Sequence, residues 1–215
     1  MHLKVNEIFP SINGEIAYPR QGSTATFIRL QGCNLRCKYC DTPHGLKGNG
    51  GKKRSIQEVL DKVAALGLRN ITVTGGEPLL QKDALTYLLQ TLHNRRYRIS
   101  VETNGSQRVP HLLNYIHWIV DYKLPSSGEH KKFDGWNTAL MRRKDVLKFV
   151  VQDREDYEAA KRFLFDADLF RASGPVLAFS PVMPDMEPGV LANWIVTDRL
   201  DATFSLQIHK VIGAR

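Results

Sequence analysis

Short apolar runs rich in β-branched residues alternate with amphipathic segments along the chain, and this alternation restricts the fold more than any other feature. The runs predict six strands, at Thr24–Leu30, Asn70–Thr74, Arg98–Val101, Trp118–Asp121, Val146–Val151 and Val176–Ser180. A last strand is predicted at Thr203–Gln207 and a minor one at Val5–Phe9. Because strands joined through helices pair in parallel, we expect an α/β fold built from βα units.

Helical patterns fill most of the connections between these strands. Ser55 and Glu58 form a capping box that opens a helix over Ser55–Leu66, whose shared apolar face is Ile56, Val59, Leu60 and Val63. Further helices are predicted at Lys82–Leu92, at Glu155–Leu164 after an Asp153 N-cap, and at Pro188–Val196.

One crossover has little room for a helix. Between Asn104 and His117 only Val109–Ile116 is available, and Pro110 lies near its start, so we expect at least one abbreviated connection. Glycine, proline and mixed charge predict two loops, at Pro43–Lys53 and Leu124–Gly135.

Length, composition and charge narrow the class of protein. The 215 residues suit a single domain, 1–215, whose core needs no disulfides. No apolar run approaches the ~20 residues of a membrane span, and the first residues lack a secretory signal, so we expect a cytoplasmic protein. The net charge is +8, but the basic residues are scattered, which favours a solvated surface over direct nucleic-acid binding.

The three cysteines of the chain, Cys33, Cys37 and Cys40, fall within eight residues. They follow the first of the six predicted strands, Thr24–Leu30. Three thiolates with this C-x3-C-x2-C spacing can hold three corners of a cubane iron–sulfur cluster. The sequence contains no fourth cysteine, so one iron would keep an open coordination position. Two other interpretations stay open: three buried cysteines, or a zinc site completed by His44.

The cysteine loop resembles the C-x3-C-x-aromatic-C motif of the radical S-adenosylmethionine (SAM) superfamily, with Tyr39 as the aromatic residue. A second segment, Thr74–Pro78, is similar to the superfamily's GGE motif, whose backbone and side chain hold the amino group of SAM. This resemblance implies a [4Fe–4S] cluster on the cysteines and bound SAM. It also implies a partial, open (β/α)6 barrel with some helices abbreviated and with its site at the carboxyl ends of the strands.

Within the superfamily, nearly the whole chain resembles the 7-carboxy-7-deazaguanine synthase family. The similar segments are Asn6–Glu15, Phe27–Cys33, Cys40–Thr42, Glu102–Gly105 and Ser205–Lys210. The chain departs from the family pattern at Asn13, where Gln is usual, at Ile16, where Gly is usual, and at Asp121–Lys123, where Ser-Pro-Lys is frequent.

The family resemblance implies a lyase activity and its partners. The family converts 6-carboxy-5,6,7,8-tetrahydropterin to 7-carboxy-7-deazaguanine by radical ring contraction with loss of ammonia, a step toward queuosine and related deazapurines of modified tRNA. SAM would act as a recyclable cofactor, and Thr42 would bind Mg²⁺. An electron donor such as flavodoxin or ferredoxin and a homodimer are also implied.

The resemblance assigns binding residues but no catalytic side chain. The SAM contacts would be Tyr39, Cys40, Asp41, Gly76, Asp121, Tyr122, Lys123 and Ser180. The substrate contacts would be Ile12, Asn13, Gly14, Glu15, Arg29 and Thr74. From the residues alone, a solvent-facing position is an alternative for Arg29, Glu15 and Lys123, and His209 is given a structural role.

Alternative functions for this chain include two other kinds of radical SAM enzyme and one binding module. A glycyl-radical activating enzyme and an RNA-modifying radical SAM enzyme share the cluster chemistry, but the chain lacks additional ferredoxin-like cysteines and an appended RNA-binding domain. A zinc-binding interaction module is the alternative that is not an enzyme.

Overall fold

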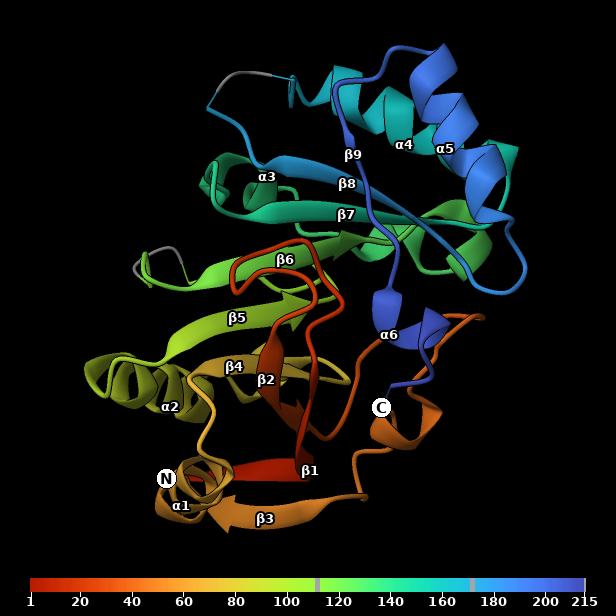
Figure 1. The fold of residues 1–215 in the computed structure, drawn as a ribbon. Coiled ribbons are helices and arrows are strands. Elements are labelled where there is room, and N and C mark those ends of the chain that lie inside the picture. The colour runs from red at the N-terminus through yellow and green to blue at the C-terminus, as the bar shows by residue number, and fades with distance from the viewer. Residues whose placement is uncertain (111–112, 171–172, 215) are drawn as a thin grey trace.

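The computed structural model describes residues 1–110, 113–170 and 173–214. Its nine strands form one sheet in the order β3-β1-β2-β4-β5-β6-β7-β8-β9. The strands are β1 (His2–Ile12), β2 (Thr24–Leu30), β3 (Lys52–Ser55), β4 (Asn70–Gly75), β5 (Arg98–Thr103), β6 (His117–Tyr122), β7 (Val146–Val151), β8 (Val176–Pro181) and β9 (Thr203–Phe204). Neighbours from β2 to β9 pair in parallel, whereas β1 is antiparallel to β2 and β3. Figure 1 shows the resulting open, curved sheet.

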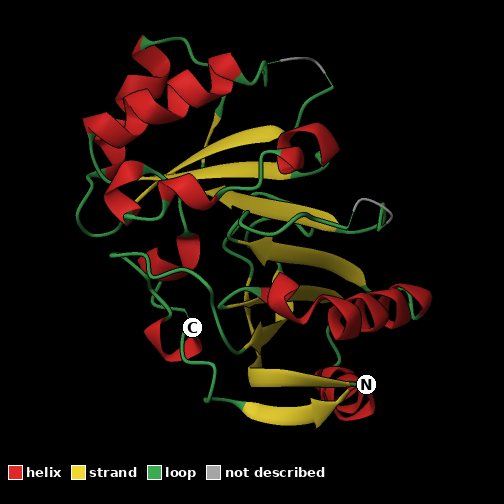
Figure 2. Ribbon diagram, turned by 180° about the vertical axis from the view of Figure 1, so that it is seen from behind, coloured by secondary structure: helices red, strands yellow, loops and turns green. Residues whose placement is uncertain are grey.

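The longer helices cover the outside of this sheet, as the view from behind in Figure 2 shows. They are α1 (Ile56–Leu66), α2 (Lys82–Asn94), α4 (Arg154–Asp166) and α5 (Pro188–Thr197). Shorter helices are α3 (Trp136–Leu140), before β7, and α6 (Ile208–Val211), after β9. The predicted caps are confirmed: Glu58 N donates to Ser55 Oγ at 3.2 Å, and Asp156 N donates to Asp153 Oδ1 at 2.9 Å. Within the described ranges, no helix is long and apolar enough to cross a bilayer.

Alternation along the parallel strands separates the core from the barrel interior. Odd-numbered positions of β4, such as Ile71 and Val73, join the apolar core under the helices. Even-numbered positions point to the opposite face and are polar: Thr72 contacts Ser100, and Thr74 contacts Glu102. The polar interior face therefore leads toward the carboxyl ends of the strands, where a ligand can reach it.

Three segments differ from the predicted elements. The N-terminal strand extends over all of β1, because it pairs on both sides. The charged segment Lys52–Ser55, which joins the predicted loop ending at Lys53 to the predicted helix beginning at Ser55, forms the edge strand β3, where lysines are common because they discourage further pairing. The last strand ends at Phe204, and Ser205 to Gln207 lead without strand structure into α6.

The crossover between β5 and β6 is abbreviated, as predicted. Positions 111–112 of the predicted helix over Val109–Ile116 lie outside the described residues, and its described residues form turns and coil. Within the described ranges, four short 3₁₀ helices complete the connections: η1 (Pro43–Gly45), η2 (Pro78–Gln81), η3 (Pro125–Ser127) and η4 (His130–Lys132).

Candidate active site

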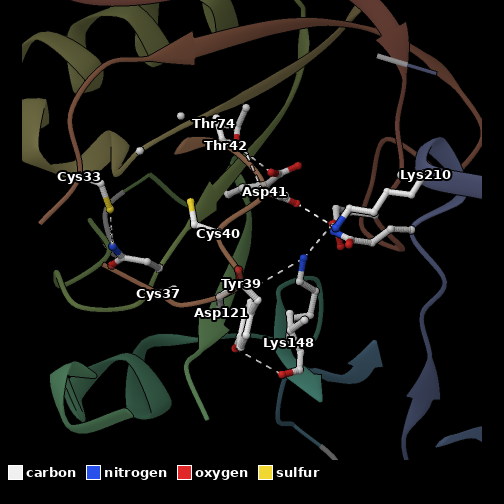
Figure 3. Close-up of a pocket in the computed structure, with 18 of the residues that line it drawn as sticks. Cys33, Cys37, Tyr39, Cys40, Asp41, Thr42, Thr74, Asp121, Lys148 and Lys210 are labelled. Carbon is white, nitrogen blue, oxygen red and sulfur yellow. Dashed lines mark hydrogen bonds and ion pairs between the residues drawn. The ribbon is translucent and has the colours of Figure 1, made fainter. Parts of the chain in front are cut away.

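A cavity of about 650 Å³ lies at the carboxyl ends of the strands, between the loop after β2 and the C-terminal segment. Figure 3 shows its labelled side chains converging from these elements. The predicted site residues that line it are Ile12, Gly14, Glu15, Arg29, Cys33, Cys37, Tyr39, Cys40, Asp41, Thr42, Thr74, Gly76, Asp121 and Lys123. Their individual binding roles remain predictions.

Backbone and side-chain hydrogen bonds together shape the cysteine loop, and Arg36 N, for example, donates to Glu129 Oε1 at 2.6 Å. Cys40 N donates to Cys37 O at 3.2 Å, and Lys38 N donates to Ser127 O at 3.1 Å. All three cysteines are partly exposed and form no disulfide. Burial raises the pKa of the Cys33 and Cys37 thiols, so a bound metal is needed to hold them as thiolates at neutral pH.

The donor set fits an iron–sulfur cluster better than a single zinc ion. The three thiols line one cavity, and the chain has no fourth cysteine. Among the described residues, no three His, Cys, Asp or Glu side chains meet closely enough to hold one metal ion. His44 does not complete a zinc site, because its Nε2 lies 3.9 Å from Glu7 Oε1, outside the cavity lining.

Glycines at the end of β4 allow that strand to touch the cysteine loop. A Cβ on Gly76 would lie 2.2 Å from the carbonyl oxygen of Gly32, and Gly75 has φ +150 with Leu30 backbone atoms equally close. Gly76 N donates to Leu30 O, and Glu77 N donates to Gly32 O at 2.8 Å. The close approach that requires these glycines is therefore to protein backbone, although both residues also line the cavity.

The Glu77 side chain does not face the cavity, which corrects the expectation that it holds the SAM amino group. It is fully buried, and its carboxylate accepts hydrogen bonds from Leu79 N, Thr103 Oγ1 and Asn104 N at 2.7 to 2.9 Å. Glu77 instead ties the end of β4 to the end of β5.

Opposite the cysteines, the cavity has a wall of buried charges. Lys148 Nζ lies 2.8 Å from Glu15 Oε1 and 3.4 Å from Asp121 Oδ1. Lys123 Nζ contacts Asp121 Oδ2 at 2.9 Å, and Gln207 Nε2 donates to Glu15 Oε1 at 3.3 Å. Glu15 Oε2 is buried without a hydrogen-bond partner among the described residues, so one acceptor of this wall is left for a ligand.

Pairing keeps most of these groups charged. Burial lowers the pKa of Lys148, but Asp121 and Glu15 outweigh burial and hold it above its ordinary value. Burial likewise raises the pKa of Asp121, yet Lys123 and Lys148 bring it below its ordinary range. The solvent-exposed alternatives for Glu15 and Lys123 are therefore excluded, since both side chains are held in ion pairs at the cavity, Glu15 buried and Lys123 only 15% exposed.

Unlike the paired groups of this wall, Glu102 is not held in its charged form. Burial, reinforced by the negative charge of Glu15, raises the pKa of Glu102 to about 7. Thr74 Oγ1 donates a hydrogen bond to Glu102 Oε2 at 2.8 Å. A carboxyl with this pKa in a cavity can take up or release a proton near neutral pH.

Arg29 points into the cavity and not into solvent. Its Nε lies 2.9 Å from Glu7 Oε1, its Nη1 donates to Thr42 Oγ1 at 3.1 Å, and its guanidinium lies over the Phe9 ring. Thr42 Oγ1 in turn donates to Asp41 Oδ1 at 3.1 Å. The Arg29 guanidinium and the side chains of Glu7, Thr42 and Asp41 thus form a compact polar corner.

The C-terminal segment closes the cavity and supplies residues that sequence reasoning missed. The His209 ring packs against Gly14, Lys210 Nζ pairs with Asp41 Oδ2 at 3.0 Å, and Gln207 reaches Glu15. His209 was assigned a structural role, but it lines the cavity. Lys148 was also missed, although a lone lysine inside the apolar run Val146–Val151 is a usable signal.

Three predicted site residues are not in the cavity lining. Asn13 is fully buried and donates to backbone carbonyls of Glu15 and Pro19, so it shapes the loop after β1. Tyr122 stacks on Phe163, with ring centroids 3.9 Å apart, on the core side of β6. Ser180 is fully buried.

Known proteins resemble the chain over its full length. A family model of the radical SAM superfamily matches residues 27–117. The 7-carboxy-7-deazaguanine synthase of Koribacter versatilis is 36% identical over 98% of this chain and 96% of its own length. The synthase of Clostridium acetobutylicum is also 36% identical, over 99% of this chain and 96% of its own length.

A solved structure supports the same assignment at the level of the fold. The crystal structure of QueE from Escherichia coli superposes with a TM-score of 0.75, covering 96% of this chain and 94% of that chain at 24% identity. The predicted radical SAM fold is thereby confirmed. Together with the full-length relatives and the open three-cysteine loop, these matches displace the zinc-module alternative: the chain belongs to the 7-carboxy-7-deazaguanine synthase family of radical SAM enzymes.

Proposed function

We propose that this chain converts 6-carboxy-5,6,7,8-tetrahydropterin to 7-carboxy-7-deazaguanine. The observation that carries the proposal is one cavity with three unpaired cysteines on one side and an arginine with buried carboxylates on the other. The first side suits a cluster with an open iron, and the second suits a flat anion with amine and amide edges. The names of the full-length relatives support the same reaction.

Cys33, Cys37 and Cys40 would hold the [4Fe–4S] cluster, and Tyr39, Gly76, Asp121 and Lys123 would surround SAM. When bound, the cluster and SAM supply the radical that removes a hydrogen atom from the substrate. The protein contributes position and the exclusion of water. Asp121 is kept ionised by Lys123 and Lys148, so it can pair with a cationic group of SAM.

The substrate would be oriented by the polar corner and the charged wall. Arg29 would pair with the substrate carboxylate, and Thr42 would supply an oxygen to Mg²⁺, which prefers such ligands. The unpartnered Glu15 Oε2 would accept a hydrogen bond from a pterin N–H. The Glu102 carboxyl can hold a proton at neutral pH and would donate it to the amino group that leaves as ammonia.

The setting of the reaction follows from its chemistry. The enzyme would take electrons from a flavodoxin or ferredoxin and would work in the reducing cytoplasm, where free thiols persist. We also propose a homodimer, in line with the family.

Anaerobic incubation of the reconstituted protein with SAM, dithionite and carboxytetrahydropterin, followed by product mass analysis, tests the function. We expect 7-carboxy-7-deazaguanine and about four irons per chain with matching sulfide. Protein that carries a complete cluster and cleaves SAM, yet yields no such product, would have a different substrate. One zinc per chain without sulfide would exclude the radical reaction itself.

A further inference from the structure

Asn104 lies in the segment Glu102–Gly105, which resembles the family motif, and the reaction described above gives the Asn104 side chain no role. It is largely buried, directly after β5. Its side-chain Nδ2 lies 3.6 Å from Cys33 Sγ and 3.1 Å from Asn34 Oδ1. An amide donor therefore reaches a sulfur that would bind the cluster.

The orientation of this amide is fixed by its other end. Asn104 Oδ1 lies 3.0 Å from Ser106 N and 2.6 Å from Ser106 Oγ. A backbone N–H can only donate, so the atom facing it must be the carbonyl oxygen. The NH₂ group must then face Cys33, and the opposite flip would place two acceptors together at the sulfur.

The backbone of Asn104 is held as firmly as its side chain. Asn104 N donates to the buried Glu77 carboxylate at 2.7 Å. The next residue is also anchored, because Asn137 Nδ2 and Asp134 N donate to Gly105 O at 3.0 and 2.9 Å. The donor is thus preorganised before any cluster binds, so no reorganisation is required when charge on the sulfur changes.

Cys33 is distinct among the three cysteines. In the part of the chain that the structure describes, its Sγ is the one that accepts hydrogen bonds, from Leu35 N at 3.4 Å and from Asn104. Hydrogen bonds to cluster sulfurs are one of the means by which proteins set reduction potentials. The reduced cluster carries one more negative charge, so a donor stabilises it more than the oxidised cluster.

We infer that Asn104 is a positioning residue that raises the reduction potential of the cluster through its hydrogen bond to Cys33 Sγ. The inference rests on the proposed function only in requiring a [4Fe–4S] cluster on the three cysteines. Its consequence is easier delivery of the electron on which SAM cleavage depends. The GGE-like segment takes part indirectly, since Glu77 holds the Asn104 backbone in place.

The test is a potentiometric titration of the reconstituted holoenzyme, with the reduced cluster quantified by electron paramagnetic resonance per iron bound. Two variants are compared with wild type: Asn104→Leu, which removes the donor, and Asn104→Asp, which keeps the shape and the acceptor for Ser106. At the wild-type midpoint potential we expect Asn104→Leu to show a reduced-to-oxidised ratio about three- to tenfold lower. A tenfold change corresponds to 59 mV for one electron. Asn104→Asp should be lower still, because it adds negative charge.

Asn137→Leu is the matched control. Asn137 is a buried asparagine that holds the same loop through Gly105 O and Gln107 O but contacts no cysteine. Because Glu77 and Ser106 still hold Asn104 itself, Asn137→Leu should lower stability and leave the reduced-to-oxidised ratio of the loaded cluster within twofold of wild type. Ratios within twofold of wild type in both Asn104 variants, or an equal shift in Asn137→Leu, would overturn the inference. The titration contains no substrate, so wild type that fails to make product would count against the proposed function alone.

Discussion

The cavity has two walls that are built on opposite plans. On the cysteine wall, hydrogen bonds and close glycine contacts fix the loop, while the three thiols form no disulfide. On the charged wall, the side chains of Glu15, Asp121, Lys123 and Lys148 are already paired with one another. The first wall is completed by its cofactor, whereas the second is preorganised by the protein. Replacing a cysteine of the first wall should therefore abolish activity. Replacing a residue of the second wall should lower activity only in part.

The largest expected effect is on the cysteine wall. Replacing Cys33, Cys37 or Cys40 by Ala leaves two protein thiolates, which should not retain the site-differentiated iron. We expect no detectable 5′-deoxyadenosine, with folding largely kept, because none of the three cysteines belongs to the apolar core cluster. A chromatographic assay measures 5′-deoxyadenosine formation, and circular dichroism measures whether the variants fold. Wild-type SAM cleavage by any of the three variants would show that the cluster is held elsewhere.

The next effect concerns Arg29, on the border between the walls. Losing a charged hydrogen-bond partner of the substrate carboxylate should lower kcat/KM for carboxytetrahydropterin by about 30- to 1000-fold, equivalent to about 2–4 kcal/mol. Arg29→Lys should not restore activity, because a point charge cannot replace the planar fork that also spans Glu7 and Thr42. SAM affinity should barely change.

Arg69→Ala is the control for Arg29, since it removes an arginine just before β4, at the opposite end of the strands. It should leave kcat/KM unchanged. Equal kcat/KM in wild type and Arg29→Ala would show that Arg29 supports only the loop through Glu7 and Thr42.

The two walls also differ in how far the sequence predicts them. The cysteine wall is contiguous in sequence, so spacing alone places Cys33, Cys37 and Cys40 together, and periodicity predicts the strands that carry them. The charged wall joins residues from the loop after β1, from β6 and from β7, and no local pattern connects Glu15 with Lys148. Tyr122 shows the same limit from the other side: its motif position suggests SAM binding, but strand alternation turns it toward Phe163.

A smaller effect is expected at Thr42. Removing its hydroxyl in Thr42→Ala should raise the Mg²⁺ concentration needed for half-maximal turnover by about tenfold, while the visible spectrum of the cluster stays intact. Thr42→Ser keeps the hydroxyl and should respond to Mg²⁺ as wild type does. Titration of turnover with Mg²⁺ measures both variants, and an unchanged response of Thr42→Ala would remove Thr42 from the metal site.

The smallest effect, on the pH dependence of stability, sharpens the comparison at Glu102, the charged-wall residue that is not kept ionised. Its pKa is raised from 4.5 to about 7, first by burial and then by Glu15. The folded state therefore binds this proton more tightly than the unfolded state. The stability that this proton contributes to the folded protein is fully present below about pH 4.5 and is lost as pH rises through 7.

The variant Glu102→Gln carries a neutral side chain at every pH. Relative to wild type, its free energy of unfolding should rise between pH 5 and 7 by on the order of 1–3 kcal/mol and then level off. Urea unfolding of the cluster-free protein at several pH values measures this difference. Parallel curves for Glu102→Gln and wild type would mean that Glu102 is ionised in the folded protein, and its proposed role in proton transfer would then be lost.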